Sequence, residues 1–174
     1  MIQRNNITKY KSLEAGIFEY NDNFFIFEKC QQGVHRFTEQ LPSDFCELSK
    51  KLNMTCSPEE MGQAIIEALR RFDLKQTPFP QFDTSARNKC IKKWFSARGI
   101  SEWEKNQRVV DVIESLVDDA HYIRPYDNNN HHPWIGPEGM PEIKLPRSAN
   151  IIDIGSNVLR AFKMATFNPQ VGTP

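Results

Sequence analysis

The sequence has no net charge, because 22 lysine and arginine residues balance 22 aspartate and glutamate residues among its 174 positions. Nucleic-acid-binding proteins usually carry a basic excess, and the chain as a whole has none. No apolar run approaches the roughly 20 residues needed to cross a bilayer. The polar segment 1–11 lacks the apolar stretch of a signal peptide. These absences predict a cytoplasmic protein that binds neither a membrane nor, directly, nucleic acid.

Cysteine pairs with the spacing of a zinc knuckle or a thiol-redox site are also missing. The four cysteines are separated by 16, 10 and 34 residues, and cytosolic cysteines are mostly reduced. The adjacent histidines His131 and His132 lie in an asparagine-rich stretch, which favours a solvated turn over a metal site. We therefore expect no metal ion or other cofactor, and buried free thiols at Cys30, Cys46, Cys56 and Cys90.

The common catalytic signatures are absent as well. The chain has no glycine-rich phosphate loop, no dinucleotide-binding fingerprint and no Gly-x-Ser-x-Gly nucleophile elbow. The sequence therefore predicts a protein without enzymatic activity. A small hydrolase that uses aspartate and histidine residues between His121 and His132 stays open as an alternative.

What the sequence does contain is enough apolar and aromatic residues, 39% and 11%, for a folded core. Aromatic and β-branched density is typical of strands, and the turn signal Asn21–Asn23 separates two such runs. The expected strands are a hairpin over 17–28, two short segments of 10–20 separated at Glu14–Gly16, and a third strand over 34–41.

The clearest helix start lies at Ser57, Pro58 and Glu60. Serine caps the helix, proline fits its first position and glutamate completes a capping box. Apolar residues then recur at helical spacing, which predicts a helix over 57–72. Further helices are expected over 43–52 with Phe45, Leu48 and Leu52 on one face, in the basic segment 87–98 with a stop at Gly99, and from Ser148 or Asn150 onward.

Two of these helix segments resemble each other. Gly62–Leu69 (GQAIIEAL) and Gly155–Phe162 (GSNVLRAF) share the glycine, the second alanine and the apolar spacing, with a period of about 93 residues. Each follows a strand candidate that ends in Leu-Pro, at Leu41-Pro42 and Leu145-Pro146. A glycine inside a helix costs about 1 kcal/mol relative to alanine, so its place in both helices indicates close approach to another backbone.

This repeat leads to the expected fold, a single α+β domain over 1–174. The two repeats span about 8–76 and 84–166, each a small antiparallel sheet followed by an amphipathic helix, and a pseudo-twofold axis would relate them. Periodicity alone leaves 109–117 open between helix and strand. The repeat favours a strand there, because 109–117 and 120–126 would correspond to the first hairpin, and 140–145 also has strand composition.

Several of these segments resemble the immunity proteins of contact-dependent growth inhibition systems (the CdiI family). Their shared pattern is an extended segment, Leu-Pro, a small capping residue and an alanine-containing helix. The matching pieces here are Tyr122–Pro125, Trp134–Gly136, Leu145-Pro146, Ser148, Ile154-Gly155 and Ala161-Phe162, with Met61-Gly62 and Ala68–Arg70 in the first half. The insertion 43–55 spreads the first motif out, which is a departure from the pattern.

The resemblance implies a bacterial, non-enzymatic toxin inhibitor. Such an immunity protein binds the toxic C-terminal domain of a delivered effector, often a nuclease, and covers its active site. The family's toxin-facing surfaces differ with each toxin, so the resemblance assigns neither catalytic nor binding residues to this chain.

Charge and residue type supply the candidate toxin-binding residues. Nuclease active sites are usually basic, so clustered carboxylates in an inhibitor favour fast and specific association. Glu114, Asp118 and Asp119 form the densest acidic stretch, and Glu102, Glu104 and Asp111 lie nearby in the sequence. Tyrosine and tryptophan are common interface anchors, and Tyr126 and Trp134 flank a polar loop. A solvated acidic face and a buried Trp134 are the structural alternatives.

One further function stays open, a single-stranded nucleic-acid-binding module. The basic residues of 87–98 would contact phosphates, with Trp94 and Phe95 as stacking platforms for bases. A core-packing helix with a solvated basic face explains the same pattern. Because basic residues gather in 87–98 and acidic ones in 102–119, the charge is segregated, which favours one protein partner.

Overall fold

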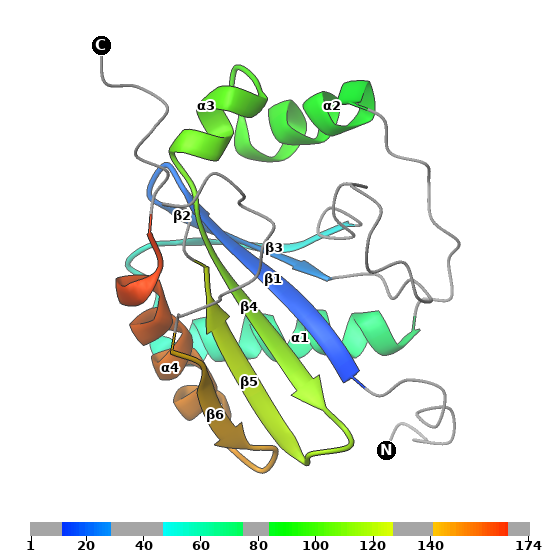
Figure 1. Ribbon diagram of the computed structural model, residues 1–174, viewed down its shortest axis with the longest axis vertical. Helices are drawn as coiled ribbons and strands as arrows, with labels where there is room; N and C mark the ends of the chain where they lie inside the picture. The colour runs from blue at the N-terminus through cyan, green and yellow to red at the C-terminus, as the bar shows by residue number, and fades with distance from the viewer. Residues whose placement is uncertain (1–11, 29–46, 75–83, 127–140, 167–174) are drawn as a thin grey trace.

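The computed structural model describes residues 12–28, 47–74, 84–126 and 141–166. Figure 1 shows their arrangement, a curved sheet with helices on both sides. The elements in chain order are β1 (Ser12–Tyr20), β2 (Asn23–Glu28), β3 (Glu47–Asn53), α1 (Pro58–Leu74), α2 (Thr84–Phe95), α3 (Ile100–Lys105), β4 (Arg108–Ser115), β5 (Ala120–Pro125), β6 (Ile143–Pro146) and α4 (Ile151–Met164).

All six strands form one antiparallel sheet in the order β3-β2-β1-β4-β5-β6. The predicted α+β class is therefore confirmed. The segment 109–117, open between helix and strand, contains most of β4, which pairs with β1 at the centre of the sheet. Within the described ranges, none of the helices is both long and apolar enough to span a bilayer.

Both halves of the sheet have the same order of elements, three antiparallel strands followed by a long helix. In the first half, the Met54 amide donates to the Asp22 carbonyl at 3.0 Å, which ties the turn after β1 to the segment after β3. In the second half, the Arg147 amide donates to the Asp119 carbonyl, also at 3.0 Å, and ties the turn after β4 to the segment after β6. The repeat and its pseudo-twofold axis stay predictions, and these matched features agree with them.

The two long helices cross where each has its glycine. A Cβ on Gly62 would lie 1.8 Å from the Ile151 carbonyl oxygen, and a Cβ on Gly155 would lie 1.8 Å from that of Pro58. Only hydrogen atoms on the two glycines allow backbones to approach this closely. The costs of glycine inside both helices are thus explained by the contact that the sequence predicted.

Local capping explains where these helices begin. The Glu60 amide donates to the Ser57 hydroxyl at 3.2 Å, and the Ser57 amide donates to the Glu60 carboxylate at 2.8 Å, which confirms the capping box. At α4, the Asp153 amide donates to the Asn150 side-chain oxygen at 2.9 Å, so Asn150 rather than Ser148 is the N-cap. Between β1 and β2, Asn21 and Asp22 have φ angles of 47° and 57°, as in a tight hairpin turn.

Three predicted features are wrong. The helix expected to stop at Gly99 ends at Phe95, and Gly99 is instead the N-cap of α3. The expected helix over 43–52 is strand β3 in its described part, where a register shift opposite Ile26 and Phe27 forms a bulge. Because the bulge adds one residue, Leu48 and Leu52 pack on opposite faces of the sheet, although their spacing of four resembles a helix. The expected break at Glu14–Gly16 is also absent, since β1 continues through these residues with partners on both sides.

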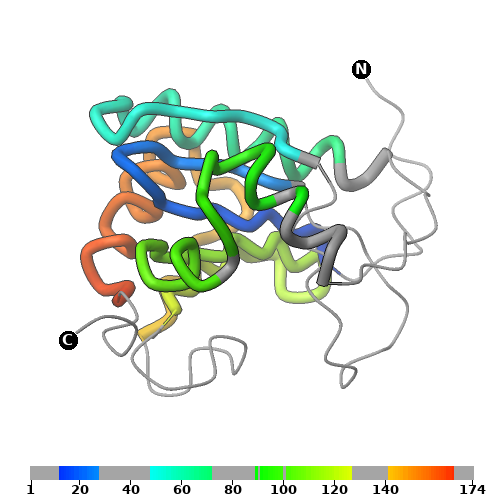
Figure 2. Tube along the Cα trace, turned by 90° about the horizontal axis from the view of Figure 1, so that it is seen from above, coloured from blue at the N-terminus to red at the C-terminus, as the bar shows by residue number. Residues whose placement is uncertain are grey.

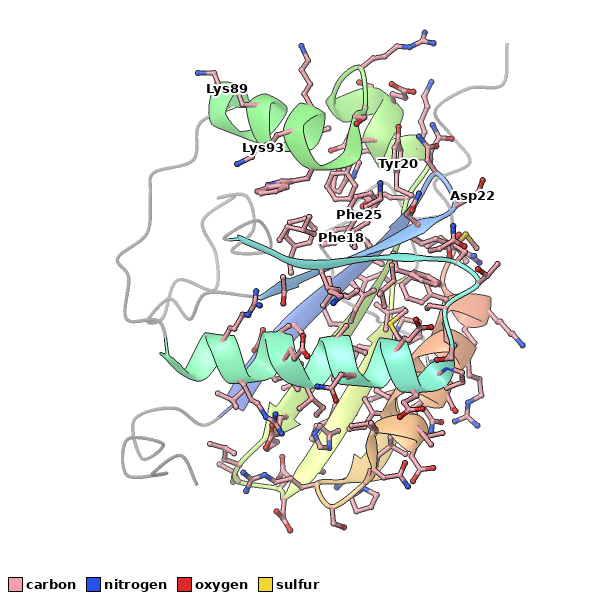
Figure 3. All side chains as sticks on the ribbon, turned by 180° about the vertical axis from the view of Figure 1, so that it is seen from behind. Phe18, Tyr20, Asp22, Phe25, Lys89 and Lys93 are labelled. Atoms are coloured by element: carbon pink, nitrogen blue, oxygen red, sulfur yellow. The ribbon has the colours of Figure 1, made fainter. Side chains whose placement is uncertain are left out.

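The sheet separates two apolar clusters. On one face, α1 packs on β1–β3 and α4 on β4–β6, around buried residues such as Ile17, Ile65 and Val158. On the other face, α2 and α3 cover an aromatic cluster, in which Phe18 lies 5.5 Å from Trp103 and Phe25 lies 4.6 Å from Phe95 between ring centroids. Figure 2 shows α1 and α4 side by side, and Figure 3 shows Phe18, Tyr20 and Phe25 between the sheet and α2–α3.

Several predictions concern residues that the structure does not describe. The strand over 34–41, the motif Leu41-Pro42 and the cysteines Cys30 and Cys46 lie outside the described residues. His35, His131, His132, Gly136 and Trp134 lie outside them as well, and so does the side chain of Cys90. Cys56 is a free, half-buried cysteine.

Candidate partner-binding site

The β4–β5 turn carries two of the predicted acidic residues, Asp118 and Asp119. Ser115 pairs with Ala120 at the strand ends, so the turn has four residues, two more than the turn between β1 and β2. Val117 in this turn is 71% exposed, the highest exposure of any large apolar side chain in the described residues. The turn therefore presents an apolar side chain next to two exposed carboxylates.

Hydrogen bonds hold this turn in one conformation. The Asp118 amide donates to the Ser115 hydroxyl at 3.1 Å, and that hydroxyl donates to the Asp118 carboxylate at 2.8 Å. Asp119 has a φ angle of 49°, a left-handed conformation that aspartate tolerates better than most residues. A turn fixed in this way loses little conformational entropy when it binds a partner.

Arg147 connects the turn to Glu114 on β4. Its Nε lies 2.6 Å from Glu114 Oε1, and its Nη1 lies 3.8 Å from Asp119 Oδ1. The Glu114 side chain is 14% exposed, whereas that of Asp119 is 83% exposed. Glu114 is thus partly neutralised inside the protein, and the carboxylates available to a partner are those of Asp118 and Asp119.

His121 lies beside this network but is not accessible. It is 2% exposed, its Nε2 is 4.0 Å from Glu114 Oε2, and its Nδ1 is 3.5 Å from the Pro146 carbonyl. A substrate cannot reach a side chain so deeply buried. In the part of the chain that is described, no three histidine, cysteine, aspartate or glutamate side chains gather as metal ligands.

Asp111 and Tyr126 lie together on the other face of the sheet. The Tyr126 hydroxyl donates to Asp111 Oδ2 at 2.5 Å, and Asp111 is only 4% exposed. Tyr126 packs against the aromatic cluster under α2 and α3. This pair therefore holds the end of β5 against the core, on the opposite face from Glu114.

Neither of the two candidate stacking platforms on α2, Trp94 and Phe95, is fully exposed. Phe95 is 3% exposed and packs among the rings of Phe18, Tyr20 and Phe25. Trp94 is half-buried, and Lys93 Nζ lies 4.1 Å above its ring. Lys89, Lys92 and Lys93 are exposed on the outside of α2, where Figure 3 labels two of them. The structure thus supports a core-packing helix with a solvated basic face.

Sequence reasoning missed two parts of this site. Arg147, which braces the turn, follows the Leu145-Pro146 motif, but its partner on β4 is known only once the strands are aligned. Tyr122 belongs to the segments of the family resemblance but not to the predicted binding residues, although tyrosine on a partly exposed strand face is a recognisable signal. Its ring lies 5.3 Å from Lys144 Nζ and 5.8 Å from Arg124 Cζ, and Arg124 forms an ion pair with Glu142.

Comparisons with known proteins identify the fold. No protein-family model matches the chain, and no curated protein is significantly similar to it. A protein of unknown function from Neisseria meningitidis has a similar structure, with a TM-score of 0.66, 17% identity, and coverage of 89% of this chain and 96% of that one. One chain of a CdiA-CT/CdiI toxin and immunity complex from Yersinia pseudotuberculosis is also similar, with a TM-score of 0.62, 14% identity, and coverage of 90% and 99%. The chain therefore shares its fold with these two proteins.

Proposed function

We propose that this chain is an immunity protein that binds and neutralises the toxin domain of a contact-dependent growth inhibition effector. The observation that carries the proposal is the likeness in fold to a chain of the CdiA-CT/CdiI toxin and immunity complex, over nearly the whole length of both chains. The sequence resemblance to the same family, in the Leu-Pro and glycine–alanine helix motifs, supports it independently.

The inhibitor acts by binding, in the cytoplasm of the cell that it protects. We propose that its toxin is a nuclease and that the β4–β5 turn contacts the basic active site. Asp118 and Asp119 provide exposed carboxylates on a rigid turn, and Val117 provides an apolar side chain between β4 and these charges. Glu114 contributes through Arg147, which it holds against the turn. Asp111 and Tyr126 position β5 instead, and Trp134 remains a candidate contact outside the described residues.

A growth assay tests the proposal. The chain is expressed alone, and then together with the C-terminal domain of a candidate cognate effector. We expect normal growth with the chain alone, arrest with the effector domain alone, and recovery when both are present and copurify. Growth arrest by the chain alone would assign it to the toxin side of such a pair. Failure to bind and to protect would refute the proposal.

A second measurement tests the nuclease and the turn. Purified effector domain is assayed for RNA and DNA cleavage with increasing amounts of this chain. We expect stoichiometric inhibition, weakened by the double substitution Asp118→Asn and Asp119→Asn, and a matched double substitution Glu59→Gln and Glu67→Gln on α1 serves as the control. Equal inhibition by all three proteins would exclude the turn as the contact.

A further inference from the structure

A row of side chains crosses the sheet in each half, at matching positions. In the first half, Phe18 pairs with Phe25 and Phe25 with Lys51, on the face that α2 and α3 cover. Counted from the turn in the same way, the corresponding row in the second half is Ile113, Tyr122 and Lys144, which pair across β4, β5 and β6. The cation–aromatic contact is also repeated, with Lys51 Nζ 5.2 Å from the Phe25 ring and Lys144 Nζ 5.3 Å from the Tyr122 ring.

The two rows differ in what covers them. Phe18 and Phe25 are 1% and 2% exposed, because Phe95 of α2 and Trp103 of α3 pack onto them. Ile113 and Tyr122 are only half-buried, Lys144 is exposed, and none of the three belongs to either apolar cluster of the described residues. Figure 1 shows α2 and α3 at the end of the sheet away from β6.

Charged residues surround Tyr122 in an ordered arrangement. Arg124 lies beside the Tyr122 ring and forms an ion pair with Glu142, so the charges of these two residues offset each other. Lys144 is exposed and its Nζ lies 5.3 Å from the ring. Its pKa is raised by a side-chain hydrogen bond with Tyr122 and by the Tyr122 charge, with smaller effects from the charges of Asp118 and Glu142.

We propose that the row of Ile113, Tyr122 and Lys144 is a docking surface for the toxin, which rests on the proposed function. The first row indicates which toxin side chains fit the second row. An aromatic or aliphatic side chain of the toxin would pack on the Tyr122 ring, as Phe95 packs on Phe25 in the first row. An acidic side chain of the toxin pairs with Lys144, which is exposed and whose Nζ lies 5.3 Å from the Tyr122 ring. Tyrosine in the centre of such a surface, with a charged rim, is typical of binding hot spots.

The pseudo-equivalent lysines provide a matched test. Binding of a catalytically inactive effector domain to the full chain is measured by calorimetry for the wild type, Tyr122→Ala, Lys144→Glu and Lys51→Glu. We expect Tyr122→Ala and Lys144→Glu to weaken binding about 30-fold or more, the size of a hot-spot loss, while Lys51→Glu binds as the wild type. Because Lys144 and Lys51 are both exposed, both charge reversals should fold, and circular dichroism checks this.

The outcomes separate the two proposals. No binding by the wild-type chain would refute the proposed function and this surface with it. Tight wild-type binding that survives both Tyr122→Ala and Lys144→Glu would overturn the docking surface and leave the immunity function standing. Equal losses for Lys144→Glu and Lys51→Glu would also overturn it, because the effect would then be one of total charge.

Discussion

The close crossing of α1 and α4 predicts that replacing a helical glycine with alanine destabilises the protein, although alanine has the higher helix propensity. Gly155→Ala places a methyl carbon 1.8 Å from the Pro58 carbonyl oxygen and 2.7 Å from its carbon. Ordinary contacts begin at 3.4 Å, so the backbones must separate by roughly 1.6 Å. No side chain can move aside to relieve this overlap, because the obstacle is the backbone of α1 itself.

Two opposing contributions decide how much Gly155→Ala changes the free energy of unfolding. Alanine favours a helix over glycine by about 1 kcal/mol. Overpacking a tight contact costs up to about 3 kcal/mol, and a backbone obstacle places this case at the upper end. We therefore expect Gly155→Ala to lower the free energy of unfolding by about 2 kcal/mol, and Tm by about 4–8 °C for a chain of this length.

Thermal and urea unfolding followed by circular dichroism measure the effect. Ser156→Ala is the matched control, since Ser156 is exposed on the next position of α4 and should change stability by less than about 0.5 kcal/mol. The double variant with Gly62→Ala should lose less than the sum of the single losses, because the first methyl already separates the helices. A Gly155→Ala protein at least as stable as the wild type would refute the close crossing.

Three other predictions follow from buried or capping contacts. Arg108→Met should lower the free energy of unfolding, measured in urea, by about 3 kcal/mol. The substitution removes the ion pair of the Glu19 carboxylate, which is 7% exposed, and the hydrogen bond to the Phe162 carbonyl. Adding Glu19→Leu to this variant should restore much of the lost stability, and no restoration would contradict the importance of the ion pair. The pKa of Glu60 is lowered by its hydrogen bonds with the Ser57 backbone and side chain. The stabilisation by the Glu60 carboxylate is therefore present above its ordinary pKa of 4.5 and is lost as the pH falls through the lowered pKa. The Tm difference between wild type and Glu60→Gln should be larger at pH 7 than in acid below pH 4.5, and a constant difference would contradict this. Burial and the nearby Glu60 charge raise the pKa of the Cys56 thiol. At pH 8, Cys56 should therefore react with a disulfide reagent more slowly than a free thiol does, and the reaction should be faster in the Glu60→Gln variant than in the wild type. Equal rates in the variant and the wild type would exclude the effect of the Glu60 charge.

Local signals in the sequence were sufficient for some elements. The hairpin turn at Asn21 and Asp22, the capping box at Ser57 and the glycine in both long helices act through neighbouring residues, so pattern reasoning found them. The strand β3 was mistaken for a helix because its bulge lies opposite β2, and a partner strand is not visible in a local pattern. The repeat predicted that 109–117 and 120–126 correspond to the first hairpin, but not that β4 pairs with β1.

The candidate site was predictable as a set of residue types and not as a surface. Glu114, Asp118 and Asp119 do lie together, since they are close in the sequence. Asp111 points to the opposite face from Glu114, because side chains alternate along β4. Residues three apart would share one face of a helix, so the open choice between helix and strand over 109–117 left the two residues together. The position of Tyr122 beside Lys144 follows only from the pairing of β5 with β6. The position of Arg147 follows only from its contact with the β4–β5 turn.

The central pairing of β1 with β4 also has a consequence for how the chain folds. Glu19 and Arg108 face each other across this pair although 89 residues separate them, whereas the pairs within each half are joined by short turns or lie closer along the chain. Closing so long a loop costs chain entropy before its contacts can repay it, and such nonlocal pairing slows folding. The two hairpins should therefore form early, and their meeting at the middle of the sheet should set the rate at which a newly made chain reaches its native fold.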